Sequence, residues 1–217
     1  MLNSVWRRIV IKVGSALISP DAKGCSTRYL LAIARFINEC RQQGVEVVLV
    51  SSGSVAAGRN AIAFTHQPLP INVKQAMAAV GQTEMMAAWS HLFDFRCAQI
   101  LLTHDDLANR RRYLNIDNTL RTLLANQVLP IVNENDSVAT AELKVGDNDN
   151  LAAMVAILVD ADALIICSDI DGLYTANPRT NAEANFIARV EQINADIYAM
   201  AGGSHHSIGT GGMLTKI

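Results

Sequence analysis

Two lysines stand beside glycines near opposite ends of the sequence. Lys12 precedes Gly14 at the end of an apolar run, and Lys216 follows the glycine-rich residues 209–213. Glycine lets the backbone turn tightly and present its amides to an anion, and a lysine adds a positive charge beside them. The two segments therefore predict a phosphate-binding site in which lysine stabilises transferred charge. For Lys12 alone, a solvated lysine at a strand end is the alternative interpretation.

Several common site motifs are missing from the sequence. It contains no G-x-x-x-x-G-K-[ST] nucleotide loop, no G-x-G-x-x-G after the first apolar run, and no G-x-S-x-G nucleophile turn. His205 and His206 are adjacent, so their side chains project in different directions, and no Cys or carboxylate stands at ligand spacing. A polar loop is therefore favoured over a metal site for this pair.

Polar segments follow other apolar runs as well. Ser52 and Gly53 follow residues 45–50, an Asn-Glu-Asn-Asp run occupies residues 133–136, and residues 146–150 open an apolar segment. Carboxylate and amide groups can hold a substrate ammonium, orient cations or coordinate Mg²⁺ through water. Turns and helix caps use the same residue types, and this remains the structural alternative.

Apolar strand-like runs alternate with longer helical patterns along the chain. The pattern predicts strands at residues 8–13, 45–50, 98–102, 128–132 and 163–167, and helices at 27–43, 72–95, 113–126 and 148–159. A further helix is expected to begin within 54–60, and a short β-like piece around Leu173. This order predicts one α/β domain with a mainly parallel sheet and helices on both faces, whose ligands bind beyond the carboxyl ends of the strands. Residues 148–159 are apolar almost all round, so we expect that helix to be buried.

Composition narrows the class of protein. The net charge of −2 and the pI near 6.2 argue against a general nucleic-acid binder. The arginine run 110–112 is interpreted as a solvated face, with a regulatory or subunit contact as the alternative. The four cysteines have no paired spacing, and Cys97 and Cys167 lie in apolar runs, so we expect buried, reduced thiols. No secretion signal is visible and the apolar stretch 151–159 is too short to span a bilayer, which predicts a cytoplasmic protein that does not enter the membrane.

Seven segments resemble, in the same order, the amino-acid kinase superfamily and within it the glutamate 5-kinase family. They read IVIKVGSAL, VLVSSGSVAAG, AVGQ, PIVNENDSVAT, VGDNDNLAA, SDIDGLYTANP and GTGGMLTK. Ala16 departs from this pattern, because many relatives carry a second hydroxyl there. The resemblance implies a three-layer αβα sandwich with a mainly parallel central sheet over residues 1–217. It also implies that the last helix and strands of the domain and the RNA-modification-type domain of many members are not included.

The resemblance implies that ATP, with Mg²⁺, phosphorylates the side-chain carboxylate of L-glutamate in the first step of proline biosynthesis. Lys12, Asp149 and Lys216 would be catalytic, and Ser52, Asp136 and Asn148 would bind glutamate. No side chain would bind the metal directly. The ATP and its phosphates would contact Gly14, Ser15, Gly53, Ser168, Asp169, Gly209, Thr210, Gly211, Gly212 and Met213.

Proline as a feedback inhibitor and a homodimer or homotetramer are also implied by the resemblance. Two alternatives stay open. One is a non-catalytic amino-acid-binding fragment, and the other is a related kinase that forms an acyl phosphate on a different carboxylate.

Overall fold

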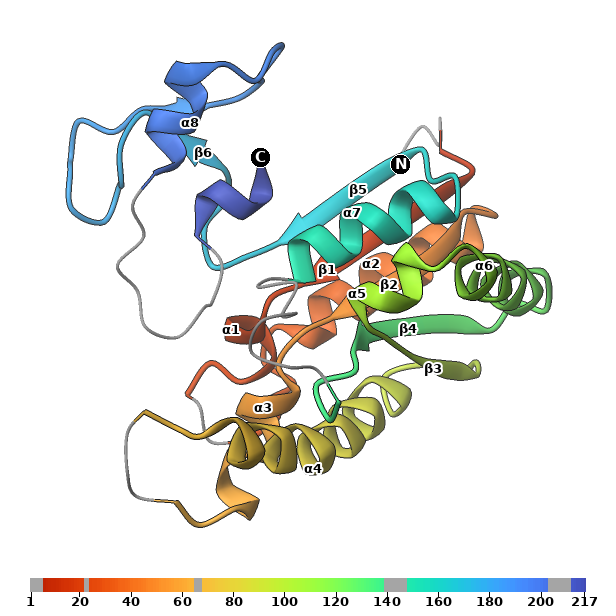
Figure 1. Cartoon of the computed structure of the whole chain (residues 1–217). Helices are drawn as coiled ribbons and strands as arrows, with labels where there is room; N and C mark the ends of the chain where they lie inside the picture. Colours follow the sequence, from red (N-terminus) through yellow and green to blue (C-terminus); the bar gives the residue numbers. More distant parts are fainter. Residues whose placement is uncertain (1–5, 22–23, 65–67, 139–147, 203–211) are drawn as a thin grey trace.

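A computed structural model describes residues 6–21, 24–64, 68–138, 148–202 and 212–217 (Figure 1). Its centre is a five-stranded sheet in the order β3-β4-β2-β1-β5, and every pair of neighbours in this sheet is parallel. The strands are β1 Arg8–Val13, β2 Glu46–Ser51, β3 Cys97–Leu102, β4 Leu129–Glu134 and β5 Ala163–Cys167. Because all five run the same way, their carboxyl ends lie along one edge of the sheet.

Helices connect the strands and cover the sheet. They are α1 Ser15–Ile18, α2 Leu30–Gln42, α3 Ser54–Ala57, α4 Ile71–Ser90, α5 His104–Ala108, α6 Arg110–Ala125, α7 Asn148–Leu158 and α8 Ala195–Ala201, with the 3₁₀ turns η1 Gly58–Ala61 and η2 Met213–Lys216. A two-stranded antiparallel sheet, β6 Leu173–Tyr174 with β7 Phe186–Ile187, follows β5. Figure 1 shows this small sheet and α8 projecting from the body of the five-stranded sheet.

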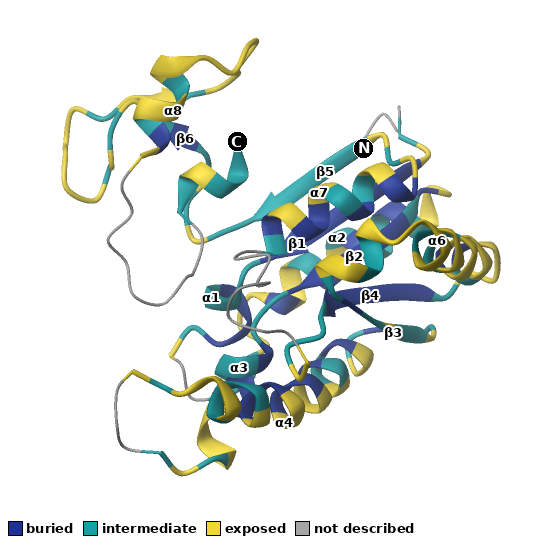
Figure 2. Ribbon diagram, in the orientation of Figure 1, coloured by how far each residue is buried: buried dark blue, intermediate teal, exposed yellow. Residues whose placement is uncertain are grey.

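Side chains alternate between the two faces of the sheet, and each face packs against helices. On one face Ile11 belongs to a buried cluster that includes residues of α2 and α4, such as Trp89. On the opposite face Val10 packs in a second cluster with Leu120 of α6 and Val155 of α7. Buried residues accordingly line β1, β2, β4 and the inner sides of α4 and α7 (Figure 2). The predicted three-layer αβα arrangement is confirmed.

Some sequence-based predictions were wrong in detail. Only one side of α7 is buried, and Ile157 on its other side is 76% exposed, because a single face of this helix contacts the sheet. The helix predicted at 72–95 ends at Ser90. Beyond it Phe93 stacks on both Trp89 and Phe95, and the contact with Phe95, two residues on, could not form within a helix. The short helices α5 and α8 were not predicted.

The cysteines are free thiols, as predicted, but they are not all buried. Cys40 is buried, whereas Cys97 and Cys167 are half-buried, because β3 and β5 are the outer strands of the sheet. Burial still raises the pKa of the Cys167 thiol, and nearby Lys12 offsets this only in part. No helix within the described residues is long and apolar enough to cross a membrane.

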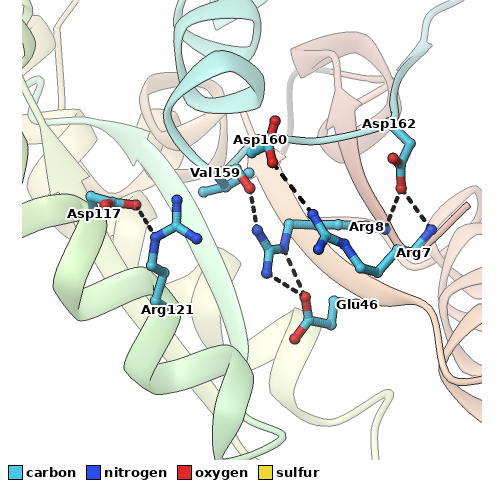
Figure 3. A network of polar contacts seen from close by, with 8 residues as sticks. All are labelled: Arg7, Arg8, Glu46, Asp117, Arg121, Val159, Asp160 and Asp162. Atoms are coloured by element: carbon cyan, nitrogen blue, oxygen red, sulfur yellow. Dashed lines mark hydrogen bonds and ion pairs between the residues drawn. The ribbon is translucent and has the colours of Figure 1, made fainter.

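At the amino ends of the strands, Arg8 of β1 contacts both β2 and the residue that follows α7 (Figure 3). Its guanidinium lies 2.6 Å from Glu46 Oε2 of β2 and donates a hydrogen bond to the carbonyl of Val159, just after α7. The Asp162 carboxylate accepts hydrogen bonds from the backbone N–H groups of Arg8, at 2.8 Å, and Arg7, at 2.6 Å. These N–H groups lower the pKa of Asp162. The carboxyl end of α7 is therefore fixed to the first two strands.

Replacing Arg8 with Met should destabilise the fold, because the Val159 carbonyl and the partly buried Glu46 both lose a donor. We expect the free energy of unfolding in urea to fall by about 2 kcal/mol. Arg35→Met is the matched control, since the ion pair of Arg35 with Glu39 is exposed and its loss should change stability by less than about 0.5 kcal/mol. Equal effects of the two substitutions would contradict a structural role for Arg8.

Candidate active site

The side chains of Lys12, Asp149 and Lys216 meet at the carboxyl end of β1. Lys12 Nζ lies 2.5 Å from Asp149 Oδ1, and Lys216 Nζ lies 2.8 Å from Oδ2 of the same carboxylate. The Asp149 side chain is fully buried, and those of Lys12 and Lys216 are 5% and 14% exposed. Water screens these charges weakly, so both ion pairs are stronger than surface pairs. Two lysines share one carboxylate, and these three groups together carry one excess positive charge.

Three elements far apart in the sequence place these groups. Lys12 is two residues after Val10 in β1, so its side chain lies on the same face of the sheet as Val10, the face that α7 covers. Asp149 is in the first turn of α7, where the helix dipole also favours an anion. Lys216 is in η2, and its Nζ also lies 3.3 Å from the carbonyl oxygen of Gly212. Strand β1, helix α7 and the turn η2 thus converge on one carboxylate.

Thr215 joins the same cluster and was missed by the sequence analysis. Its Oγ1 lies 2.9 Å from Asp149 Oδ2 and 2.9 Å from the carbonyl oxygen of Gly212. Its hydroxyl can therefore support the carboxylate that holds both lysines. The available signal was a hydroxyl residue directly before Lys216 in a glycine-rich segment.

A second group of polar side chains forms a chain of hydrogen bonds beside these lysines. Asn148 Nδ2 donates to Ser52 Oγ and to Asn133 Oδ1, both at 2.8 Å. Asn133 Nδ2 donates to Gln82 Oε1 at 2.8 Å, and Gln82 Nε2 donates to Gln99 Oε1 at 3.3 Å. Asn133 and Gln82 had no assigned role in the sequence analysis, although Gln82 interrupts an otherwise apolar helix face. Since Asn148 and Asp149 are consecutive, this series of hydrogen bonds lies next to the lysine cluster.

Asp136 is hydrogen-bonded to helix α3, which begins two residues after Ser52. Ser54 Oγ donates a hydrogen bond to Asp136 Oδ2 at 2.7 Å. The turn before Ser54 needs glycine, because Gly53 has a φ of 104° and a Cβ there would lie 2.9 Å from Ile18 Cβ. Helix α4 also approaches α3 closely, since a Cβ on Gly81 would lie 1.9 Å from the Ser54 carbonyl oxygen. These contacts fix the positions of Ser54 and of Gln82, the residue after Gly81.

The residues predicted to bind phosphate surround the same edge of the sheet. Ser15 begins α1, and the Gly14 backbone N–H donates to the carbonyl oxygen of Cys167 at 3.2 Å. Gly14 has a φ of −72°, which residues other than glycine also adopt. A Cβ on Gly14 would lie 3.9 Å from Lys12 Nζ, so the missing side chain leaves space beside that ammonium.

The other residues predicted to contact ATP lie less close to the two lysines or outside the described residues. Ser168 and Asp169 follow β5, next to β1 in the sheet, but Asp169 is exposed and pairs with Arg179 at 2.7 Å. This hydrogen bond lowers the pKa of Asp169. Gly212 and Met213 lie at the start of η2. The other three, Gly209, Thr210 and Gly211, lie outside the described residues.

The described residues offer no cluster of three or more His, Cys, Asp or Glu side chains that could hold a metal ion. The polar groups at this edge are instead suited to bind an anion beside the lysines and an ammonium beside Asp136 and the amides. The fold and the site thus have the form of an α/β protein whose polar groups, at the carboxyl ends of parallel strands, are suited to bind an anion and a polar small molecule.

The chain belongs to the amino acid kinase family, which matches residues 7–217. It is 64% identical over 212 residues to a glutamate 5-kinase of Idiomarina loihiensis, an alignment that covers 98% of this chain and 57% of that protein. A glutamate 5-kinase of Salinibacter ruber is 56% identical, with coverage of 98% and 57%, and one of Xanthomonas campestris is 53% identical, with coverage of 96% and 58%. The chain therefore spans slightly more than half the length of these relatives.

A solved structure supports the fold. The UMP kinase of Bacillus anthracis superposes with a TM-score of 0.54 at 17% identity, over 83% of this chain and 72% of that one. At this identity the likeness concerns the arrangement of strands and helices and not the substrate.

Replacing Asp149 with Ala should destabilise the protein, because buried Lys12 loses its carboxylate. We expect the free energy of unfolding in urea to fall by about 3 kcal/mol, as when one partner of a buried ion pair is removed. Asp196→Ala is the matched control: Asp196 also lies in a first helical turn, that of α8, but is exposed, so its loss should cost less than about 1 kcal/mol. A similar small loss for both variants would show that the buried pairs contribute little.

Proposed function

We propose that the protein transfers the γ-phosphoryl group of ATP to the side-chain carboxylate of L-glutamate, giving L-glutamyl 5-phosphate and ADP. This reaction is the first step of proline biosynthesis. The observation that carries the proposal is a pair of largely buried lysines on one carboxylate, next to a group of amide and carboxylate side chains. Identities of 53–64% to proteins named glutamate 5-kinase support glutamate as the substrate.

The chemistry needs neutralisation of charge more than acid–base catalysis. A carboxylate is ionised at neutral pH, so no general base is required. A glutamate oxygen forms a bond to the γ-phosphorus while the bond to the β,γ-bridging oxygen breaks, and that oxygen leaves with ADP. Negative charge is then spread over the transferred group and both flanking oxygens. Lys12 and Lys216 would stabilise this charge, and Asp149 would hold both ammonium groups in place before the reaction.

Glutamate would bind against Ser52, Asp136 and Asn148. Asp136 supplies a carboxylate for the α-ammonium group, which would be costly to bury without an acceptor. Ser54 orients this carboxylate through its 2.7 Å hydrogen bond. Ser52 and Asn148 are already hydrogen-bonded to each other at 2.8 Å, which supports a single binding group.

ATP would bind on the other side of the lysines. Backbone amides around Gly14, Ser15 and Gly53 would contact the phosphates, and Ser168, Asp169 and residues 209–213 would line the nucleotide site. Mg²⁺, which neutralises phosphate charge in such reactions, would be held through the phosphates of ATP, as the resemblance implies. The lack of a side chain at Gly14, where a Cβ would lie 3.9 Å from Lys12 Nζ, supports the close approach of a phosphate.

Further parts of the proposal depend on the resemblance. Residues 1–217 would belong to one kinase domain of a protein that forms a homodimer or homotetramer, with proline as a feedback inhibitor. The chain's four free thiols fit a reducing compartment such as the cytoplasm.

Trapping with hydroxylamine tests the substrate, because an acyl phosphate reacts to a coloured hydroxamate. With Mg²⁺ and ATP we expect hydroxamate from L-glutamate, and at least about tenfold less from L-aspartate or N-acetyl-L-glutamate, which misplace or block the ammonium contact. Lys12→Met should remove the signal, and Lys74→Met on α4 should retain it.

Two outcomes would contradict the proposal. A larger signal from aspartate or N-acetylglutamate would indicate a kinase for a different carboxylate. Binding of glutamate without hydroxamate from any substrate would indicate a non-catalytic amino-acid-binding module.

A further inference from the structure

A line of amide side chains, the middle two of them buried, connects the glutamate-binding group to the edge of the sheet. It runs from Asn148 on α7 through Asn133 on β4 and Gln82 on α4 to Gln99 on β3. Asn133 and Gln82 are 1% and 8% exposed, and Gln99 is exposed. Such buried amides are costly unless each donor meets an acceptor, so their orientations depend on one another.

The hydrogen bonds give this line a direction. Gln82 accepts from Asn133 through Oε1, so Asn133 presents its own Oδ1 to Asn148. Asn148 then uses both hydrogens of Nδ2, one on Asn133 and one on Ser52. Its oxygen Oδ1 is consequently turned away from both partners and acts as the acceptor of this side chain.

The contacts of Asn148 alone do not fix that direction. If all amides turned over, Asn133 would donate to Asn148 Oδ1, and the Ser52 hydroxyl could donate there too, because a hydroxyl is both donor and acceptor. Asn148 would then turn its NH₂ group outward, which would repel an ammonium. In the structure the Gln82 side chain presents Oε1 to Asn133 and Nε2 to exposed Gln99, and it lies on a helix positioned by the close contact at Gly81.

We propose that Gln82 is a positioning residue that sets the direction of this line, so that Asn148 offers its carbonyl oxygen to the α-ammonium group of the substrate. The inference rests on the proposed glutamate site. Gln82 acts through Asn133 and Asn148 and does not touch the substrate. It would thereby help to select an amino acid over a dicarboxylate that lacks the amino group.

Two substitutions at Gln82 distinguish an effect on the direction of the hydrogen bonds from an effect on side-chain packing. Gln82→Glu keeps an acceptor facing Asn133, and exposed Gln99 can turn its NH₂ toward the new carboxylate, so the direction is retained. Gln82→Met fills a similar volume but cannot accept, so both directions become available. Gln42→Met, at the exposed end of α2, is the control for a glutamine-to-methionine change.

Calorimetric titration of each variant of the chain with L-glutamate and with glutarate, which lacks the amino group, tests the proposal. We expect Gln82→Met to bind glutamate about tenfold more weakly, the effect of one lost polar contact, with glutarate binding changed less than threefold. Gln82→Glu and Gln42→Met should keep the preference for glutamate. Circular dichroism should show that all variants are folded.

The possible failures can be told apart. Equal weakening of glutamate and glutarate by Gln82→Met, or loss of the preference in Gln82→Glu as well, would assign Gln82 a packing role and overturn the inference alone. An unchanged preference in Gln82→Met would do the same. If the unaltered chain binds neither ligand, the glutamate site itself is refuted, and the inference with it.

Discussion

The arrangement depends on one buried carboxylate shared by two lysines. Asp149 accepts Lys12 on one oxygen and Lys216 on the other, and its side chain is fully buried. A single lysine would leave a neutral pair, whereas two leave one positive charge that can bind an anion. Because that charge lies in a poorly hydrated place, it acts on a bound phosphate more strongly than a surface lysine could.

The fold supports this carboxylate from both ends of α7. At its amino end the helix presents Asn148 and Asp149 to the carboxyl edge of the sheet, where β1, β2, β4 and β5 all end. Just beyond its carboxyl end, the Val159 carbonyl is bound by Arg8, which also pairs with Glu46 (Figure 3). A helix that packs one face on the sheet and is fixed at both ends can hold two side chains in constant geometry, one toward the lysines and one toward the amides.

Much of the fold was predictable because its signals are local. Strands β1 and β5 have the predicted bounds, since short runs of Val, Ile and Leu end at polar or glycine residues. The polar segments that follow the strands were predicted to meet because parallel strands end along one edge. Helix α5 was missed because five residues show no period, although Thr103 and Asp106 form a capping box.

Contacts between distant side chains could not be predicted in the same way. The bonds from Gln82 to Asn133 and from Asn133 to Asn148 depend on strand order and on the close contact of α3 with α4. The sequence shows Gln82 only as a polar residue on the apolar face of a helix. The exposure of Ile157 likewise depends on which side of α7 meets the sheet.

The claim that one carboxylate organises two catalytic lysines is tested most directly by glutamate-dependent ADP release with Mg²⁺ and ATP. The account predicts release by the unaltered chain and a loss of at least about 1,000-fold in Asp149→Ala, the scale of a removed electrostatic contact to transferred phosphate. The comparison is made where circular dichroism shows that the variant is folded. Near-normal release by folded Asp149→Ala would contradict it.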